Sequence, residues 1–184
     1  MITTKIHCFL LLFLTSWGCK TAPIEAPLFT SLDSAQTGVG FVNRVQDTPQ
    51  LNIIDYLYFY NGGGVSAGDV NNDGLTDLYF VSNQGPNKLY LNRSQTGGSQ
   101  KDQSIHFQDI TTNANVAGKA DWQTGTTMAD VNGDGLLDIY VCAVSQFRGT
   151  KGHNELYINN GPGPDGIPTF TEQAEAYGLA FAGF

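Results

Sequence analysis

Residues 69–77 read DVNNDGLTD, and residues 130–138 read DVNGDGLLD. Both stretches follow the pattern D-x-N-x-D-G-x-x-D, and the second begins 61 positions after the first. Alternating positions carry short side chains with oxygen atoms, which can converge on one hard cation. Calcium takes about six to eight oxygen ligands from carboxylates, amides, backbone carbonyls and water. The glycine at the sixth position permits a sharp turn that returns the later ligands to the ion. The sequence therefore predicts two calcium-binding loops.

Each loop is expected to bind one structural Ca²⁺ through four side chains and one backbone carbonyl. The predicted ligands are Asp69, Asn71, Asp73, Leu75 and Asp77 in the first loop, and Asp130, Asn132, Asp134, Leu136 and Asp138 in the second. Two metal-free turns are the alternative, because Asp, Asn and Gly are common in turns. Turn formation alone does not require the fourth aspartate, which is present in both copies.

The residues after each loop exclude an EF-hand. An EF-hand needs a bidentate glutamate at position 12, and that position holds Phe80 in the first copy and Val141 in the second. The runs that follow, residues 78–81 and 139–144, are rich in β-branched and aromatic residues, which favour buried strands over an exiting helix. Each loop is therefore expected to connect two strands.

Composition favours one compact domain with many turns. The chain has 184 residues, of which 41% are hydrophobic and 14% are charged, together with 22 glycines. This is too apolar for a disordered chain. The net charge is −8, and six of the 17 acidic residues lie in the two loops. No basic patch is visible, which argues against a nucleic acid as partner.

The N-terminus has the features of an export signal. Lys5 and a short apolar run over residues 8–14 precede Gly18 and Cys19, and this run is too short to span a bilayer. The segment resembles a bacterial lipoprotein signal. Residues 1–18 would then be removed, and lipidated Cys19 would anchor the chain to a membrane. An ordinary secretory signal is the alternative. Both predict an exported protein: an outer-membrane or cell-surface lipoprotein, or a secreted one.

A four-strand order occurs twice along the chain. One strand leads into each loop and a second strand leaves it. A third strand carries the motif N-x-L-Y-x-N, and a tail that begins with phenylalanine follows. A period near 60 residues with four short strands per unit is typical of β-propeller blades. We therefore expect an all-β partial β-propeller with two four-stranded blades and the edges of neighbouring blades. No convincing amphipathic helix is expected, although residues 171–177 could make one turn.

Together the loops, the flanking Gly-x-x-Ala-Gly and Leu-Tyr or Ile-Tyr segments and the third-strand motif resemble the FG-GAP/VCBS repeat over residues 29–184. That repeat forms the calcium-bearing propellers of integrin alpha subunits and many bacterial surface proteins. The combination is similar to bacterial relatives of cartilage acidic protein. The resemblance implies the ten calcium ligands named above.

The expected organisation follows the repeat. Residues 1–18 form the signal and 19–40 a tether with a partial strand. Residues 41–118 form the first FG-GAP-like blade, 119–177 the second, and 178–184 the start of a third repeat. Because a closed propeller has about four to eight blades, we expect a truncated chain or a fragment of a longer protein. A two-blade chain that assembles with its own copies is the rival.

The expected function is binding without catalysis. The chain would be a calcium-stabilised surface propeller for adhesion or for binding a glycan or protein. The alternative is an accessory or catalytic part of a secreted polysaccharide- or lipid-degrading enzyme whose active site lies outside this chain. Ser66 sits in a G-x-S-x-G match, but a metal loop follows instead of a helix. Residues 56–60 and Trp122 are expected to pack between blades, with an aromatic ligand platform as the alternative.

Overall fold

The structure is a computed structural model that describes residues 27–95 and 104–183. The predicted signal peptide and the predicted lipidated Cys19 lie outside the described residues. The chain separates into two units, residues 1–31 and 32–184. In the first unit, residues 27–31 are exposed and belong to no helix or strand.

Two antiparallel four-stranded sheets form the second unit, and in each sheet the strands lie side by side in chain order. The first sheet contains β1 (Val65–Gly68), β2 (Asp77–Phe80), β3 (Lys88–Asn92) and β4 (Phe107–Asp109). The second contains β5 (Gln123–Ala129), β6 (Asp138–Ala143), β7 (Glu155–Pro162) and β8 (Pro168–Glu172). The predicted all-β fold with two four-stranded blades is confirmed.

The two sheets repeat the same strand register. Gly68 lies opposite Asp77 where β1 pairs with β2, and Ala129 lies opposite Asp138 where β5 pairs with β6. The predicted loops therefore begin and end at equivalent points of two hairpins. The predicted strands agree with the observed ones to within a few residues, because runs of β-branched and aromatic residues and the repeated order both mark them.

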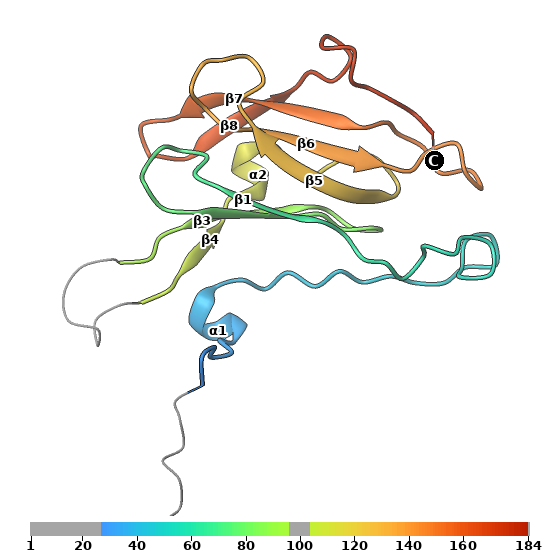
Figure 1. The fold of residues 1–184 in the computed structure, drawn as a ribbon, viewed down its shortest axis with the longest axis horizontal. Helices are drawn as coiled ribbons and strands as arrows, with labels where there is room; N and C mark the ends of the chain where they lie inside the picture. The colour runs from blue at the N-terminus through green and yellow to red at the C-terminus, as the bar shows by residue number, and fades with distance from the viewer. Residues whose placement is uncertain (1–26, 96–103, 184) are drawn as a thin grey trace, which may run out of the picture. The chain divides into compact units, whose positions relative to one another are not determined.

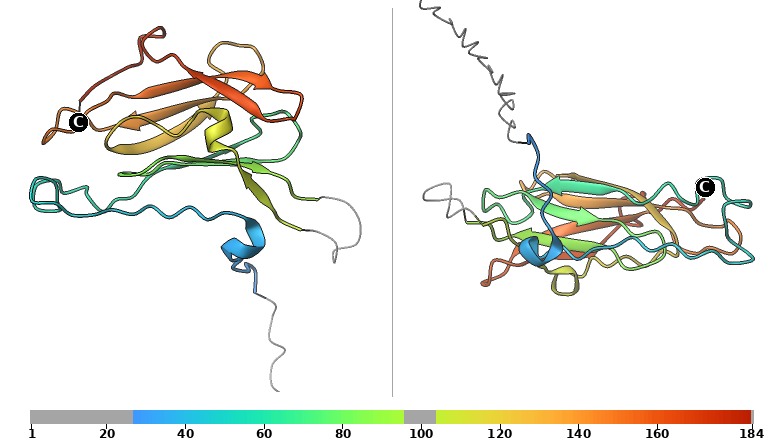
Figure 2. Two further views of the ribbon diagram at one scale, coloured as in Figure 1. Left: turned by 180° about the vertical axis from the view of Figure 1, so that it is seen from behind. Right: turned by 90° about the horizontal axis from the view of Figure 1, so that it is seen from below.

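The two sheets lie face to face, with the one-turn helix α2 (Thr111–Ala114) between them (Figure 1). Figure 2 shows the same stacking from behind and from below. One core cluster joins both sheets, and it contains Val70, Tyr79, Val81, Leu89, Leu91, Ile110, Ala114, Val116, Ile139, Val141, Tyr157 and Phe170. Burial of this apolar surface is the main force that holds the sheets together.

The repeated tails end in a similar way. Helix α1 (Ser34–Thr37) is followed by Gly38 at φ 78°, and α2 is followed by Asn115 at φ 62°. The third tail makes a turn that closes at Gly178, with φ 68°. The two helices were not expected from the sequence, because four residues are too few to show a 3.6-residue period. In the described part of the chain, no helix has the length and apolar character needed to cross a membrane.

The far face of each sheet is covered by a neighbouring part of the chain. On the first sheet, Phe41 stacks on Phe80 with ring centroids 5.1 Å apart. On the second, Leu156 and Ile158 pack with Ala174 and residues 179–180. Of the segment expected to form a tether and partial strand, the described residues 27–40 contain the helix α1 and no strand; Asp33 caps α1 by accepting a hydrogen bond from the backbone N–H of Gln36. Assignment of residues 178–184 to a third repeat stays a prediction.

Candidate metal centre

The two predicted loops occupy equivalent places in the fold. The first loop connects β1 to β2 and the second connects β5 to β6, so both lie between strands as the sequence predicted. Gly74 and Gly135 each have φ 86°, a left-handed conformation that glycine adopts readily. Position 12 of each stretch lies in a strand, which agrees with the exclusion of an EF-hand.

The first aspartate of each loop binds the backbone of the turn. Asp69 accepts hydrogen bonds from the backbone N–H groups of Asp73 at 3.1 Å and Gly74 at 2.7 Å. Asp130 does the same with Asp134 at 3.2 Å and Gly135 at 2.9 Å. These bonds lower the pKa of Asp130, with Gly135 as the main cause. Both loops are therefore held in the same closed conformation.

The third ligand position also repeats. Asp73 accepts a bond from the N–H of Leu75 at 2.9 Å, and Asp134 from that of Leu136 at 2.8 Å. The amide of Asn71 donates to Asp73 at 2.9 Å. The predicted ligands of each loop thus lie close together, but in the described residues no three His, Cys, Asp or Glu side chains form a metal-binding group.

The fourth aspartate joins the loop to the third strand, a role that the sequence analysis missed. Asp77 is 0% exposed and accepts bonds from the N–H groups of Val70 at 2.9 Å and Asn92 at 2.7 Å. Asp138 is 1% exposed and accepts from Val131 at 3.0 Å and Asn159 at 2.8 Å. This clamp gives the repeated fourth aspartate a structural reason that does not require a metal.

The pKa of Asp77 is raised to about 6, chiefly by burial; the nearby Asp73 and Asp69 also raise it, whereas the bonds from Asn92 and Val70 lower it. An ionised carboxylate has about four lone-pair sites. The two backbone bonds therefore leave Asp77 able to bind a cation as well.

One atom in the first loop fits the role of a cation ligand. The amide oxygen of Asn71, a residue that is 9% exposed, is buried and has no hydrogen-bond partner among the residues that the structure describes. Buried polar atoms nearly always have a partner, and an amide oxygen is a common calcium ligand. In the second loop the corresponding oxygen of Asn132 accepts a bond from the N–H of Asp134 at 3.0 Å. The oxygen-rich donor set therefore fits a hard cation, and the first loop provides the more direct indication.

The third-strand asparagines have structural roles. The amides of Asn92 and Asn159 donate to the carbonyls of Thr76 and Leu137 at the end of each loop, at 2.9 and 3.1 Å. At the other end of the motif, Asn87 accepts from the N–H of Ser82 at 2.9 Å, and its equivalent Asn154 makes the matching bond to Ala143. The N-x-L-Y-x-N motif thus fixes both ends of the hairpin that follows each loop.

The residues considered as ligand or catalytic groups have other contacts. Trp122 is buried against Phe59, with ring centroids 5.1 Å apart, whereas Tyr58 is 64% exposed. Packing between blades is therefore observed for Trp122 and Phe59. The hydroxyl of Ser66 lies 3.3 Å from that of Thr126 on the neighbouring sheet, which agrees with its interpretation as a strand residue.

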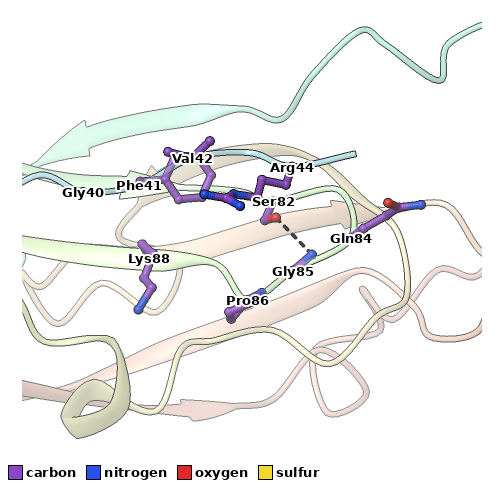
Figure 3. Close-up of a pocket in the computed structure, with 9 residues that line it drawn as sticks. All are labelled: Gly40, Phe41, Val42, Arg44, Ser82, Gln84, Gly85, Pro86 and Lys88. Carbon is purple, nitrogen blue, oxygen red and sulfur yellow. Dashed lines mark hydrogen bonds between the residues drawn. The ribbon is translucent and has the colours of Figure 1, made fainter. Parts of the chain in front are cut away.

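A hollow of about 340 Å³ lies on the far face of the first sheet. It is lined by Gly40, Phe41, Val42, Arg44, Ser82, Gln84, Gly85, Pro86 and Lys88, and Figure 3 shows these side chains. Two of them are cationic and none is acidic. Lys88 pairs with Asp109 at 2.8 Å, whereas Arg44 has no hydrogen-bond or ion-pair partner among the described residues.

Comparison with known families agrees with this geometry. Residues 69–141 match the model of the FG-GAP-like repeat, so the match begins at the first loop and ends in β6 after the second. No curated protein matches the chain in sequence. The matched segment is less than half of the 184 residues, but it includes both loops. Residues 69–141 thus carry an FG-GAP-like repeat, within a chain that has a partial β-propeller fold.

Proposed function

We propose that the chain is part of an exported, non-enzymatic surface propeller that two structural calcium ions stabilise and that binds an extracellular glycan or protein. FG-GAP-like repeats are typical of extracellular β-propeller domains without catalytic activity. The observation that carries the calcium part is the buried, unpartnered amide oxygen of Asn71 in a loop rich in carboxylates. Each loop would supply five of the ten predicted ligands. The metal in each loop would hold the hairpin between the first two strands of its sheet.

Calcium is expected to raise the melting temperature of the full chain, and magnesium is expected to have little effect. A ligand at 100 times its dissociation constant stabilises the folded state by about 2.7 kcal/mol, which raises the melting temperature by roughly 5–10 °C per site for a chain of this size. Asp73→Ala and Asp134→Ala should each remove one of the two contributions. The measurements are thermal melting and calorimetric titration.

The matched control is Glu175→Ala, which removes an exposed acidic residue outside both loops and should keep the full calcium response. A folded wild-type chain whose melting temperature does not change with calcium would contradict the metal sites. The same conclusion would follow if both loop variants kept the wild-type calcium response.

The hollow around Arg44 is the proposed contact for an acidic ligand, because the Arg44 guanidinium is unpaired among the described residues and Arg44 lines the hollow together with the aromatic Phe41. We expect an oligosaccharide that contains glucuronic acid to bind in preference to a neutral one. Arg44→Gln should weaken binding by about tenfold or more, as expected for a charged hydrogen bond, whereas Arg93→Gln should not. Equal binding of both sugars by calorimetry would contradict this assignment.

A further inference from the structure

The first loop contacts the second repeat at three points. The amide of Asn159 donates to the carbonyl of Val70 at 2.8 Å, and the amide of Asn71 donates to that of Gly166 at 3.3 Å. The amide of Asn72 donates to the carbonyl of Gly135 at 3.2 Å. The third contact joins the two predicted calcium loops directly.

The backbone conformation at Asn72 indicates that its side chain serves the contact with Gly135. Asn72 has φ 56°, a left-handed conformation, and the equivalent position in the second loop is Gly133 at φ 78°. Glycine adopts this conformation without steric cost, and asparagine adopts it less readily. The first loop therefore has an asparagine where glycine would suit the backbone better, and its amide reaches the other loop.

The contact lies between predicted ligands on both sides. Asn72 is flanked by Asn71 and Asp73, and Gly135 is flanked by Asp134 and Leu136. An ion in the second loop would fix the residues on either side of Gly135, and with them the position of its carbonyl. That carbonyl would in turn hold Asn72, so that less conformational entropy is lost when Asn71 and Asp73 bind the first ion.

We propose that the Asn72–Gly135 hydrogen bond couples the two calcium loops, so that an ion in either loop raises the calcium affinity of the other. The coupling is mutual because a binding free energy shared between two sites is reciprocal. This inference rests on the proposed calcium sites. Two divalent ions also repel each other, which acts in the opposite direction. Asn72→Gly leaves all charges in place and therefore isolates the contribution of the bridge.

The test is a calorimetric calcium titration of four full-length proteins: wild type, Asn72→Gly, Asp134→Ala and the double variant. Asn72→Gly should fold, because glycine accepts the observed φ. We expect Asn72→Gly to weaken binding of the ion that enters when the other loop is already occupied by roughly three- to tenfold, the usual contribution of one hydrogen bond. In the Asp134→Ala background, where no ion occupies the second loop, Asn72→Gly should have little effect.

Asn115→Gly is the matched control, because Asn115 is an exposed asparagine with φ 62° that lies outside both loops. It should bind calcium like the wild type. The inference is overturned if Asn72→Gly binds both ions like the wild type. It is also overturned if Asn72→Gly weakens binding equally with and without Asp134, since Asn72 would then act only within its own loop. A folded wild type that binds no calcium overturns the proposed metal sites themselves. That outcome differs from one in which both ions bind independently, which overturns only the coupling.

Discussion

Asp77→Ala is expected to lower the free energy of unfolding by about 3–5 kcal/mol, because it removes a buried carboxylate and leaves one buried and one partly buried backbone donor without an acceptor. The donors are the N–H groups of Val70 and Asn92, which Asp77 binds at 2.9 and 2.7 Å. Urea denaturation in the presence of a chelator is the appropriate measurement, since it separates the clamp from any contribution of bound metal.

Two comparisons make this prediction specific. Asp134→Ala removes an exposed acidic residue from the other loop and should cost less than about 1 kcal/mol in the chelator. Asp77→Asn keeps one acceptor oxygen and should lie between alanine and the wild type. If Asp77→Ala and Asp134→Ala unfolded at the same urea concentration, the clamp would have no energetic importance.

Trp122→Ala is expected to cost about 3–5 kcal/mol, the usual range for a buried aromatic residue replaced by alanine. Trp122 is 1% exposed and packs on Phe59 and Tyr56, with ring centroids 5.1 and 5.7 Å away. These contacts join the segment before β1 to the segment before β5, so their loss should weaken the pairing of the two sheets. Thermal or urea unfolding of the full chain measures the effect.

Trp122→Phe provides a finer comparison. The indole N–H of Trp122 is buried and has no hydrogen-bond partner within residues 27–95 and 104–183, so phenylalanine removes an unsatisfied donor while keeping an aromatic ring. We expect it to cost much less than alanine. Tyr58→Ala should change stability by less than about 0.5 kcal/mol, because its side chain is mostly exposed. A larger loss for Tyr58 than for Trp122 would contradict the packing role.

The sequence predicted most of the fold because the same signals occur twice. The loop pattern, the runs of β-branched and aromatic residues and the third-strand motif each appear in both halves with a similar spacing, so each copy supports the interpretation of the other. The left-handed turns at Gly74 and Gly135 follow from residue type alone. The division into two four-stranded sheets was therefore predictable before any contact was known.

The sequence did not predict the contacts that join residues far apart in the chain. Asp77 was assigned only to the metal, because the pattern gives no sign that its carboxylate faces the N–H of Asn92 in another strand. The separation of buried Trp122 from exposed Tyr58 depends on the position of the loop before β1. Metal binding by the ten predicted ligands stays a prediction, for which the orphaned oxygen of Asn71 is the structural support.

The reach of Asn159 back to Val70 has a consequence for how the chain is divided. The repeat copied along the sequence is not the unit that folds, since a strand in the later copy completes the hydrogen bonding of a loop in the earlier one. Neighbouring repeats joined in this way share their stability. Separating the halves between residues 118 and 119 would remove the hydrogen bonds between the first loop and the second repeat. The half that contains the first loop should therefore be the less stable of the two products.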